Sequence, residues 1–131
     1  MSSNRQCVLD ALHTIISDPT HSPERIARWF SPQYQQQVDG NLLNYEQFIA
    51  HMATLKAVTR AMTIDIKAIA DSGDDVLTHH YARITKQDGK SSLIEVFAHF
   101  QLRAGRIVRC DELTRLLTGD PADSDLGQRI A

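Results

Sequence analysis

Four long runs of alternating apolar and polar residues fill the second half of the chain, and they constrain its fold more than any other feature. The runs cover residues 62–68, 76–85, 92–103 and 106–116, and short turn-forming segments separate them. Alternation with a period of two is typical of strands that bury one face. Because tight turns join antiparallel neighbours, the sequence predicts a four-stranded meander. Strands of about ten residues twist strongly, and such a sheet can curl around a packed helix.

The first half of the chain is predicted to be mainly helical. Apolar residues recur at helical spacing in residues 4–17, 23–29 and 45–57. Each range has a start or stop signal, and these are Asp18-Pro19, Ser22-Pro23 and the capping-box pair Asn44 and Gln47. Residues 31–41 are predicted to be extended. Helices first and a meander after indicate an α+β fold.

Composition and charge exclude several classes of protein. The chain has 131 residues, of which 42% are hydrophobic and 23% charged, as expected of one globular domain. A net charge of −2 argues against nucleic acid and anionic membrane surfaces as partners, because both are bound by basic patches. No apolar run reaches the length of a membrane-spanning helix, and the first residues lack the apolar core of a signal peptide.

Cysteine usage and the chain end complete this outline. Cys7 and Cys110 have no paired spacing, so we expect free thiols in a reducing compartment and a cytoplasmic location. Residues 1–117 are expected to form a single domain. Residues 118–131 are expected to be a polar tail without an element of its own, because they are rich in turn formers and charges.

Three segments point to a known family. They read WFSPQYQQQVDG (29–40), GDDVLTHHYARIT (73–85) and HFQLRAGRIVRCDEL (99–113). With the order of predicted elements, residues 5–117 resemble the NTF2-like superfamily, which includes ketosteroid isomerase, scytalone dehydratase and the SnoaL-like polyketide cyclases. The resemblance implies a cone in which three N-terminal helices pack on a strongly curved, mainly antiparallel sheet. It also implies an internal pocket on the concave face and, often, a homodimer through the convex face.

Site residues carry over from this resemblance only in part. The isomerases have an Asp general base at the end of the first short strand, where the nearest acid of this chain is Asp39. They also have a protonated Asp just before an aromatic segment, but here Ala98 precedes His99-Phe100. In the isomerases this protonated Asp is one half of the oxyanion hole, the pair of donors that stabilises the charged substrate oxygen. This chain lacks that half, so steroid isomerisation is not expected. An alternative role for Asp39 is that of an ordinary turn residue.

The resemblance also predicts which strand residues face the pocket. The concave face would carry Ile94, Val96, Ala98, Phe100 and Leu102, followed after the next turn by Val108, Cys110, Glu112 and Thr114. A β-bulge between these two strands would reverse the second set and turn Asp111 inward instead of Glu112. The outer face would carry Glu95, Phe97, His99 and Gln101, a mixed set suited to an oligomer surface. Buried Glu112 would either pair with an inward histidine or with Arg83, or have a raised pKa and a proton to give. Cys110 is most simply a small core residue.

Further candidates come from the residues alone. Tyr34 and Gln36 share one face of the first strand and could bind a carbonyl oxygen, although Tyr34 could equally be a core residue. His51 borders the apolar face of the third helix beside Met52. It could act as an acid or base in the pocket, or it could be a boundary histidine bonded to the backbone.

Two adjacent histidines leave a choice open. His79 and His80 cannot both face inward from a regular strand. Thr78, Ala82 and Ile84 share a face with His80 and form the more apolar row, which favours His80 as the inward residue. The resemblance, with positions counted back from Gly89, favours His79 and Tyr81 instead. No spacing typical of a metal site occurs among the histidines and cysteines.

These observations support two hypotheses. In the first, the protein binds a small, mostly apolar organic molecule and catalyses proton transfer (isomerisation, dehydration or cyclisation) with Glu112 or Asp39 as the base and no cofactor. In the second, it is a non-catalytic ligand-binding or dimerisation module. A cavity of roughly 300 Å³ or more with convergent polar groups would favour the first, and a cavity filled by Phe48, Met52, Met62 and Phe100 would favour the second. A homodimer is expected through Glu95, Phe97 and His99.

Overall fold

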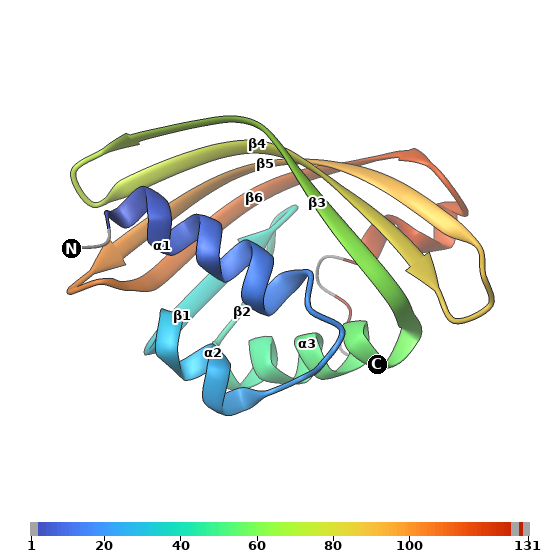
Figure 1. Cartoon of the computed structure of the whole chain (residues 1–131), viewed down its shortest axis with the longest axis horizontal. Coiled ribbons are helices and arrows are strands. Elements are labelled where there is room, and N and C mark those ends of the chain that lie inside the picture. Colours follow the sequence, from blue (N-terminus) through green and yellow to red (C-terminus); the bar gives the residue numbers. More distant parts are fainter. Residues whose placement is uncertain (1–2, 127–128, 130–131) are drawn as a thin grey trace.

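A strongly curved sheet arches over the helices in the computed structural model, which describes residues 3–126 and Arg129 (Figure 1). The helical elements are α1 (Asn4–Ala11), the π-helical turn η1 (Leu12–Ile16), α2 (Pro23–Trp29), α3 (Tyr45–Val58) and the 3₁₀ helix η2 (Pro121–Asp125). The strands are β1 (Phe30–Val38), β2 (Asn41–Leu43), β3 (Thr59–Ser72), β4 (Asp75–Lys86), β5 (Ser91–Arg103) and β6 (Arg106–Thr118). The α+β fold class is thus confirmed.

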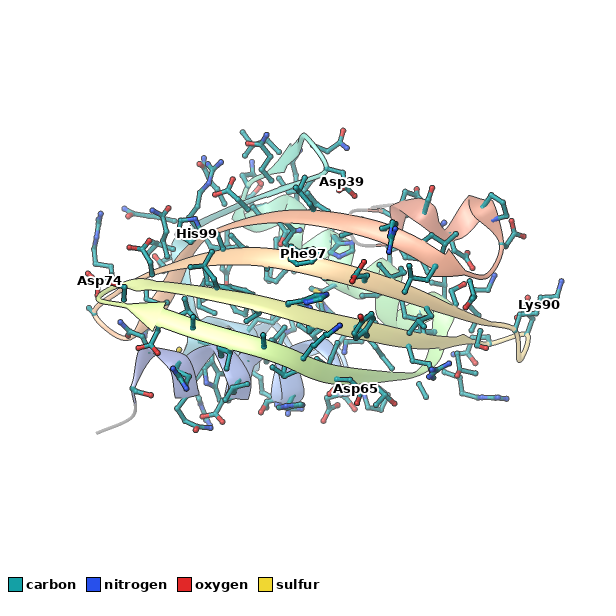
Figure 2. The ribbon with its side chains drawn as sticks, turned by 90° about the horizontal axis from the view of Figure 1, so that it is seen from above. Asp39, Asp65, Asp74, Lys90, Phe97 and His99 are labelled. Carbon is teal, nitrogen blue, oxygen red and sulfur yellow. The ribbon has the colours of Figure 1, made fainter. Side chains whose placement is uncertain are left out.

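One six-stranded sheet contains every strand, in the order β2-β1-β6-β5-β4-β3. All neighbours are antiparallel except β1 and β6, which run parallel. The long strands form the predicted meander from β3 to β6. Helices α1, α2 and α3 lie on its concave side, and none of the described residues forms a layer over the convex side (Figures 1 and 2).

The helix starts follow the predicted caps. The Ser22 hydroxyl accepts a hydrogen bond from the backbone of α2, and Pro23 is its first residue. Asn44 and Gln47 form the complete capping box of α3. A feature that the sequence did not indicate joins α3 to the end of the first helix. The Lys56 ammonium donates to the carbonyl oxygens of Ile15 and Ile16, each at 2.7 Å, and to that of Asp18.

Alternate residues of β4 and β5 point into the core, as predicted. On β5 the buried residues are Ser92, Ile94, Val96, Ala98, Phe100 and Leu102. On β4 they are Val76, Thr78, His80, Ala82 and Ile84. These two rows face helices α1 and α3, so they determine which side chains of the sheet can line a cavity between the sheet and the helices.

A β-bulge on β6 corrects one predicted orientation. Gln101 pairs with Arg109 and Leu102 with Ile107, so Val108 is left without a partner on β5. Ile107 is therefore the fully buried residue, and the prediction that Val108 faces the pocket was wrong. After the bulge the alternation resumes. Cys110 is buried as expected, and Glu112 and Thr114 line the internal cavity described below.

The chain end also departs from the expectation. β6 continues to Thr118, and residues 121–125 form η2, so the prediction of a tail without an element of its own was wrong. Leu126, which follows η2, is buried in the hydrophobic core. The buried Leu126 side chain and the hydrogen bond from Ser92 to Asp123 hold this segment against the rest of the protein. Neither contact can be deduced from the local composition of the sequence.

Candidate functional site

An internal cavity of about 90 Å³ lies between the concave face of the sheet and helices α1 and α3. Apolar side chains form most of its wall, and Val96, Phe100 and Met52 are among them. The polar residues of the wall come from four elements, and they are Tyr34, Gln36, His51, His80, Glu112 and Thr114. The volume is smaller than the roughly 300 Å³ typical of a ligand pocket. Six polar side chains nevertheless converge on this small space.

Glu112 is the acid of this cavity. Burial raises the pKa of its carboxyl group to about 7, with a smaller contribution from the negative charge of Asp39. The Cys110 thiol, two residues earlier on the same face, donates a weak hydrogen bond to Oε1 at 3.4 Å. Burial raises the pKa of Cys110 well above its ordinary value, so it remains a thiol. No ion pair to Glu112 is found among the described residues, so the predicted pairing with a histidine or Arg83 is not seen.

Tyr34 and Gln36 form a polar pair beside this acid. The Tyr34 hydroxyl donates to Oε1 of Gln36 at 2.9 Å, and both side chains are buried. Since the amide oxygen accepts this bond, the amide NH₂ group of Gln36 has donors to spare. The ring of Tyr34 packs against Phe30 and Phe48, with ring centroids 4.8 Å from each. Burial raises the pKa of Tyr34 well above its ordinary value, so the phenol is a hydrogen-bond donor.

Two neutral histidines complete the polar wall. Burial lowers the pKa of His80 to about 4, and the Thr78 hydroxyl lies 3.0 Å from its Nδ1. Burial also lowers the pKa of His51. Nδ1 of His51 lies 2.8 Å from the carbonyl oxygen of Arg129, which can only accept, so this nitrogen carries the proton and Nε2 is an acceptor. The structure thus unites both sequence interpretations of His51, which borders the cavity and bonds the backbone.

His79 and Tyr81 do not line the internal cavity. Both lie on the convex side of β4, where Nε2 of His79 donates to the Glu95 carboxylate at 2.7 Å and the His79 ring stacks on Phe97 with centroids 4.0 Å apart. The count from the resemblance was therefore wrong for these two residues, and the apolar row that favoured His80 predicted the correct face.

Asp39 is a turn residue outside the cavity wall, so its predicted place as a base in the pocket was wrong. It has a φ of 51° in the turn between β1 and β2, at the sheet edge (Figure 2). Its carboxylate accepts hydrogen bonds from the backbone N–H of Thr114, at 2.8 Å, and from the Thr114 hydroxyl. Asp39 thus fixes β6 close to Glu112. Cys110 likewise lies behind the wall instead of lining it.

Sequence reasoning missed two parts of the wall. Leu12 and Ile16 come from the π-helical turn η1, and local sequence gives no signal for a π turn. Leu126 comes from the chain end. It and Ile130 are the large apolar residues of the chain end, so an anchoring role could have been suspected, but only the three-dimensional structure shows that Leu126 reaches the cavity.

A second, open hollow of about 540 Å³ lies on the convex face. Ile69, Leu77, Phe97 and Leu113 are among its lining residues. Figure 2 shows Phe97 and His99 on this uncovered side. The hollow is larger than the internal cavity, and its titratable lining residues are His79, His99, Asp111 and Glu112, of which Glu112 also lines the internal cavity. The internal cavity, however, has the more enclosed wall, and its polar residues Gln36, His51 and His80 are buried. We therefore place the candidate site for chemistry inside the cone.

Comparison with known proteins agrees with this architecture. The SnoaL-like domain profile matches residues 10–110. The chain belongs to the SnoaL-like family. An uncharacterised protein of Schizosaccharomyces pombe is 32% identical over 127 residues, which cover 97% of this chain and 98% of the relative.

Solved structures share the fold of this SnoaL-like protein at low sequence identity. IdmH of Streptomyces antibioticus, for which polyketide cyclase activity is proposed, is 16% identical and superposes with a TM-score of 0.71 over 97% of this chain and 98% of IdmH. A de novo designed protein with a curved β-sheet is 20% identical and superposes with a TM-score of 0.65 over 99% of this chain and 97% of the design. Since a designed protein has the same fold, the fold by itself does not define the activity.

Two further observations concern metals and membranes. Among residues 3–126 and Arg129, no three His, Cys, Asp or Glu side chains gather where they could hold a metal ion. In the same part of the chain, no helix has the length and apolar character needed to cross a membrane.

Proposed function

We propose that this SnoaL-like protein binds a small, mostly apolar organic molecule inside the cone and catalyses proton transfer on it, with Glu112 as the acid or base. The observation that carries this proposal is the Glu112 carboxyl group in a largely apolar wall with a pKa of about 7. At neutral pH such a group is present in both protonation states, so it can take a proton and return it.

The neighbouring polar groups suit a substrate whose oxygen gains negative charge. Removing a proton from the carbon next to a carbonyl group places charge on the carbonyl oxygen. The amide NH₂ of Gln36, supported by Tyr34, is a donor that could bind this oxygen. Isomerisation, dehydration and aldol-type cyclisation all pass through such a step. The apolar remainder of the wall, including Val96 and Phe100, favours a hydrocarbon skeleton.

Solvent deuterium exchange tests this proposal without knowledge of the natural substrate. The purified protein is incubated in D₂O with a panel of small ketones and enones, and loss of the α-proton signals is followed by NMR. We expect exchange of at least one compound to be faster than in buffer. Glu112→Gln should reduce the protein-dependent rate by about 10²–10⁴, whereas the exposed control Glu46→Gln should not. Equal rates for Glu112→Gln and wild type would contradict the role of Glu112.

The small cavity favours a second candidate function, that of a non-catalytic ligand-binding or dimerisation module. The cavity has only about 90 Å³ because side chains occupy most of the space inside the cone. Phe48, Met52, Met62 and Phe100 all contribute to its wall. Binding of panel compounds without any exchange would support a ligand-binding role. The absence of both binding and exchange would leave only the role of a dimerisation module.

We further propose that a second copy of the chain covers the convex face through Glu95, Phe97 and His99. Phe97 and Leu77 are each 51% exposed and Leu113 is 68% exposed, because no element among the described residues covers this face. A stable homodimer would bury about 1,200–2,000 Å² in total. A cytoplasmic location is proposed from the cysteines, since Cys7 and Cys110 are both free and buried.

A further inference from the structure

The C-terminal segment Gly119–Leu126 covers part of the internal cavity next to β5, where it contacts Ser92. Its Leu126 is 1% exposed and belongs to the cavity wall. Most of the other residues of the segment, including Pro121, Ala122 and Ser124, are exposed. The segment is therefore a cap with one apolar side chain that reaches inward.

A polar latch holds this cap. The Asp123 carboxylate accepts a hydrogen bond from the Ser92 hydroxyl at 2.7 Å and pairs with the Lys86 ammonium at 3.0 Å. Burial alone would raise the pKa of Asp123, but the hydrogen bonds from Ser92 and Lys86 outweigh it and the net pKa is lowered. The latch is thus an ion pair that joins η2 to the end of β4. Lys86 is able to regain water when such a contact opens, because it lies at the end of β4.

A glycine permits the chain to fold back so closely. Gly119 has a φ of 125°, and a Cβ atom at this position would lie 2.3 Å from the Ser92 hydroxyl oxygen. Only glycine fits here, both for the backbone conformation and for the space. It follows directly on the end of β6 at Thr118. A rigid strand, a glycine and a small cap therefore follow one another in the chain.

The cap is also connected to a polar group of the site. The carbonyl oxygen of Arg129 accepts the hydrogen bond from Nδ1 of His51 at 2.8 Å. The guanidinium of the same residue donates to Asp125 and to the carbonyl oxygen of Ala122, which ties it to η2. Displacement of the cap would thus remove Leu126 from the wall and release His51 at the same time.

The volume of the cavity is too small for most organic ligands while Leu126 occupies its place in the wall. The cavity has about 90 Å³ with the segment in place, whereas an apolar cavity of about 150 Å³ holds one benzene molecule. A substrate with a carbon skeleton of more than a few atoms therefore needs additional room. Leu126 is the wall residue whose backbone belongs to the cap, so it can provide that room without disturbing the sheet or the long helices.

We propose that Leu126 sets the upper size of the ligand and that the segment Gly119–Leu126, latched by Asp123, is the gate through which the ligand enters. This inference rests on the proposed function only in that the cavity is a ligand site. It assigns specificity and access to the chain end, where the sequence predicted only a tail. The ligand class that fits is an uncharged organic molecule larger than the closed cavity.

Binding of a non-reacting fluorescent probe tests the gate. The probe is 1-aminoanthracene, an uncharged three-ring amine, and its affinity is measured by fluorescence titration. Leu126→Ala is expected to bind it on the order of tenfold more tightly than wild type, and Leu126→Val by an intermediate factor. The control Leu117→Ala removes an exposed leucine at the end of β6 that is not part of the cavity wall and should match wild type. Equal affinities for Leu126→Ala and Leu117→Ala would overturn the size limit.

The latch is tested separately by the rate of probe association. Asp123→Asn leaves the shape of the side chain but removes its charge, and stopped-flow mixing should show association on the order of tenfold faster than in wild type. Unchanged association would overturn the gate. Methyl NMR shifts locate the probe. Shifts at Val96 and Met52 support the inference, and shifts at Leu77 and Leu113 without them would contradict it.

The outcomes separate the gate from the proposed chemistry, because the probe undergoes no reaction. Tighter probe binding by Leu126→Ala together with no deuterium exchange on any ketone would sustain the gate and contradict the catalytic proposal. Deuterium exchange that depends on Glu112, together with no effect of Leu126→Ala or Asp123→Asn on the probe, would sustain the chemistry and contradict the gate.

Discussion

Adjacent residues of one strand lie on the concave and convex faces of the sheet and differ in burial and in their bonding partners. His79 and His80 show this most clearly. His80 is buried in the cavity wall, and its pKa is lowered to about 4, so it is neutral at physiological pH. His79, the preceding residue, donates a hydrogen bond to Glu95 and stacks on Phe97 on the open face. One residue of register thus separates a histidine in the cavity wall from a histidine that bonds a carboxylate on the opposite face.

The acids of the two faces differ in the same way. Glu112 lies in the cavity wall, where burial raises its pKa to about 7. Glu95 on the convex face has a lowered pKa because His79 and then Arg115 interact with its carboxylate. The raised pKa suits Glu112 to the proposed proton transfer, whereas Glu95 is ionised at neutral pH. Experiments that compare residues of the two faces test this assignment directly.

Truncation of one phenylalanine on each face should give the largest difference. Phe100→Ala removes a ring that is 4% exposed and should lower the free energy of unfolding by about 3–5 kcal/mol, the usual cost of such a core truncation. Phe97→Ala on the convex face removes a ring that is 51% exposed and should cost less than about 1 kcal/mol in the monomer. Urea unfolding of both variants measures the difference. Similar losses would show that the convex face is as deeply buried as the core.

The pH dependence of stability should reveal the buried acid. The folded-state pKa of Glu112 is about 7 against an ordinary value of 4.5, so between these pH values the folded protein holds a proton that the unfolded chain has lost. Its contribution is complete below pH 4.5 and is lost as the pH rises to about 7. The loss amounts to about 3 kcal/mol, since one pKa unit corresponds to about 1.4 kcal/mol.

Glu112→Gln isolates this contribution. The difference in unfolding free energy between the variant and wild type should shift in favour of the variant by about 3 kcal/mol from pH 4.5 to pH 8. The exposed control Glu46→Gln should show no such shift. A constant difference across this range would mean that the Glu112 carboxyl group is well solvated. Urea titrations at several pH values provide the comparison.

The smallest expected change in stability accompanies a change of assembly. Phe97→Glu places a charge in the middle of the proposed dimer face and should give monomers, with little effect on the fold of each copy. Light scattering at tens of micromolar protein distinguishes the two states. A wild-type protein that is already monomeric at this concentration would contradict the proposed homodimer.

Periodicity predicted the fold and most of the inward-facing residues, and it did so for a physical reason. On β5 every second residue is apolar, so only one register buries them, and the prediction for Ile94 to Leu102 was correct. On β6, Ile107 and Val108 are both apolar and β-branched, so either could have faced inward. Pairing of Ile107 with Phe30 on the parallel strand β1 accompanies the bulge, and this contact is not local in sequence.

The site residues were predictable where a side chain follows the strand pattern, and unpredictable where tertiary contacts decide. Glu112 followed from its place on the inward row. Asp39 did not, because its role is set by two hydrogen bonds with Thr114, which is far away in the sequence. Leu126 could not be assigned because its burial depends on a latch between Asp123 and Ser92.

The central claim is that Glu112 is a poorly solvated acid that exchanges its proton near neutral pH. A ¹³C NMR titration of the glutamate carboxyl groups measures this most directly, with Glu112→Gln to assign the signal. The account predicts a midpoint for Glu112 of about 7. A midpoint near the ordinary glutamate value of 4.5 would contradict it and would remove Glu112 from any role in proton transfer.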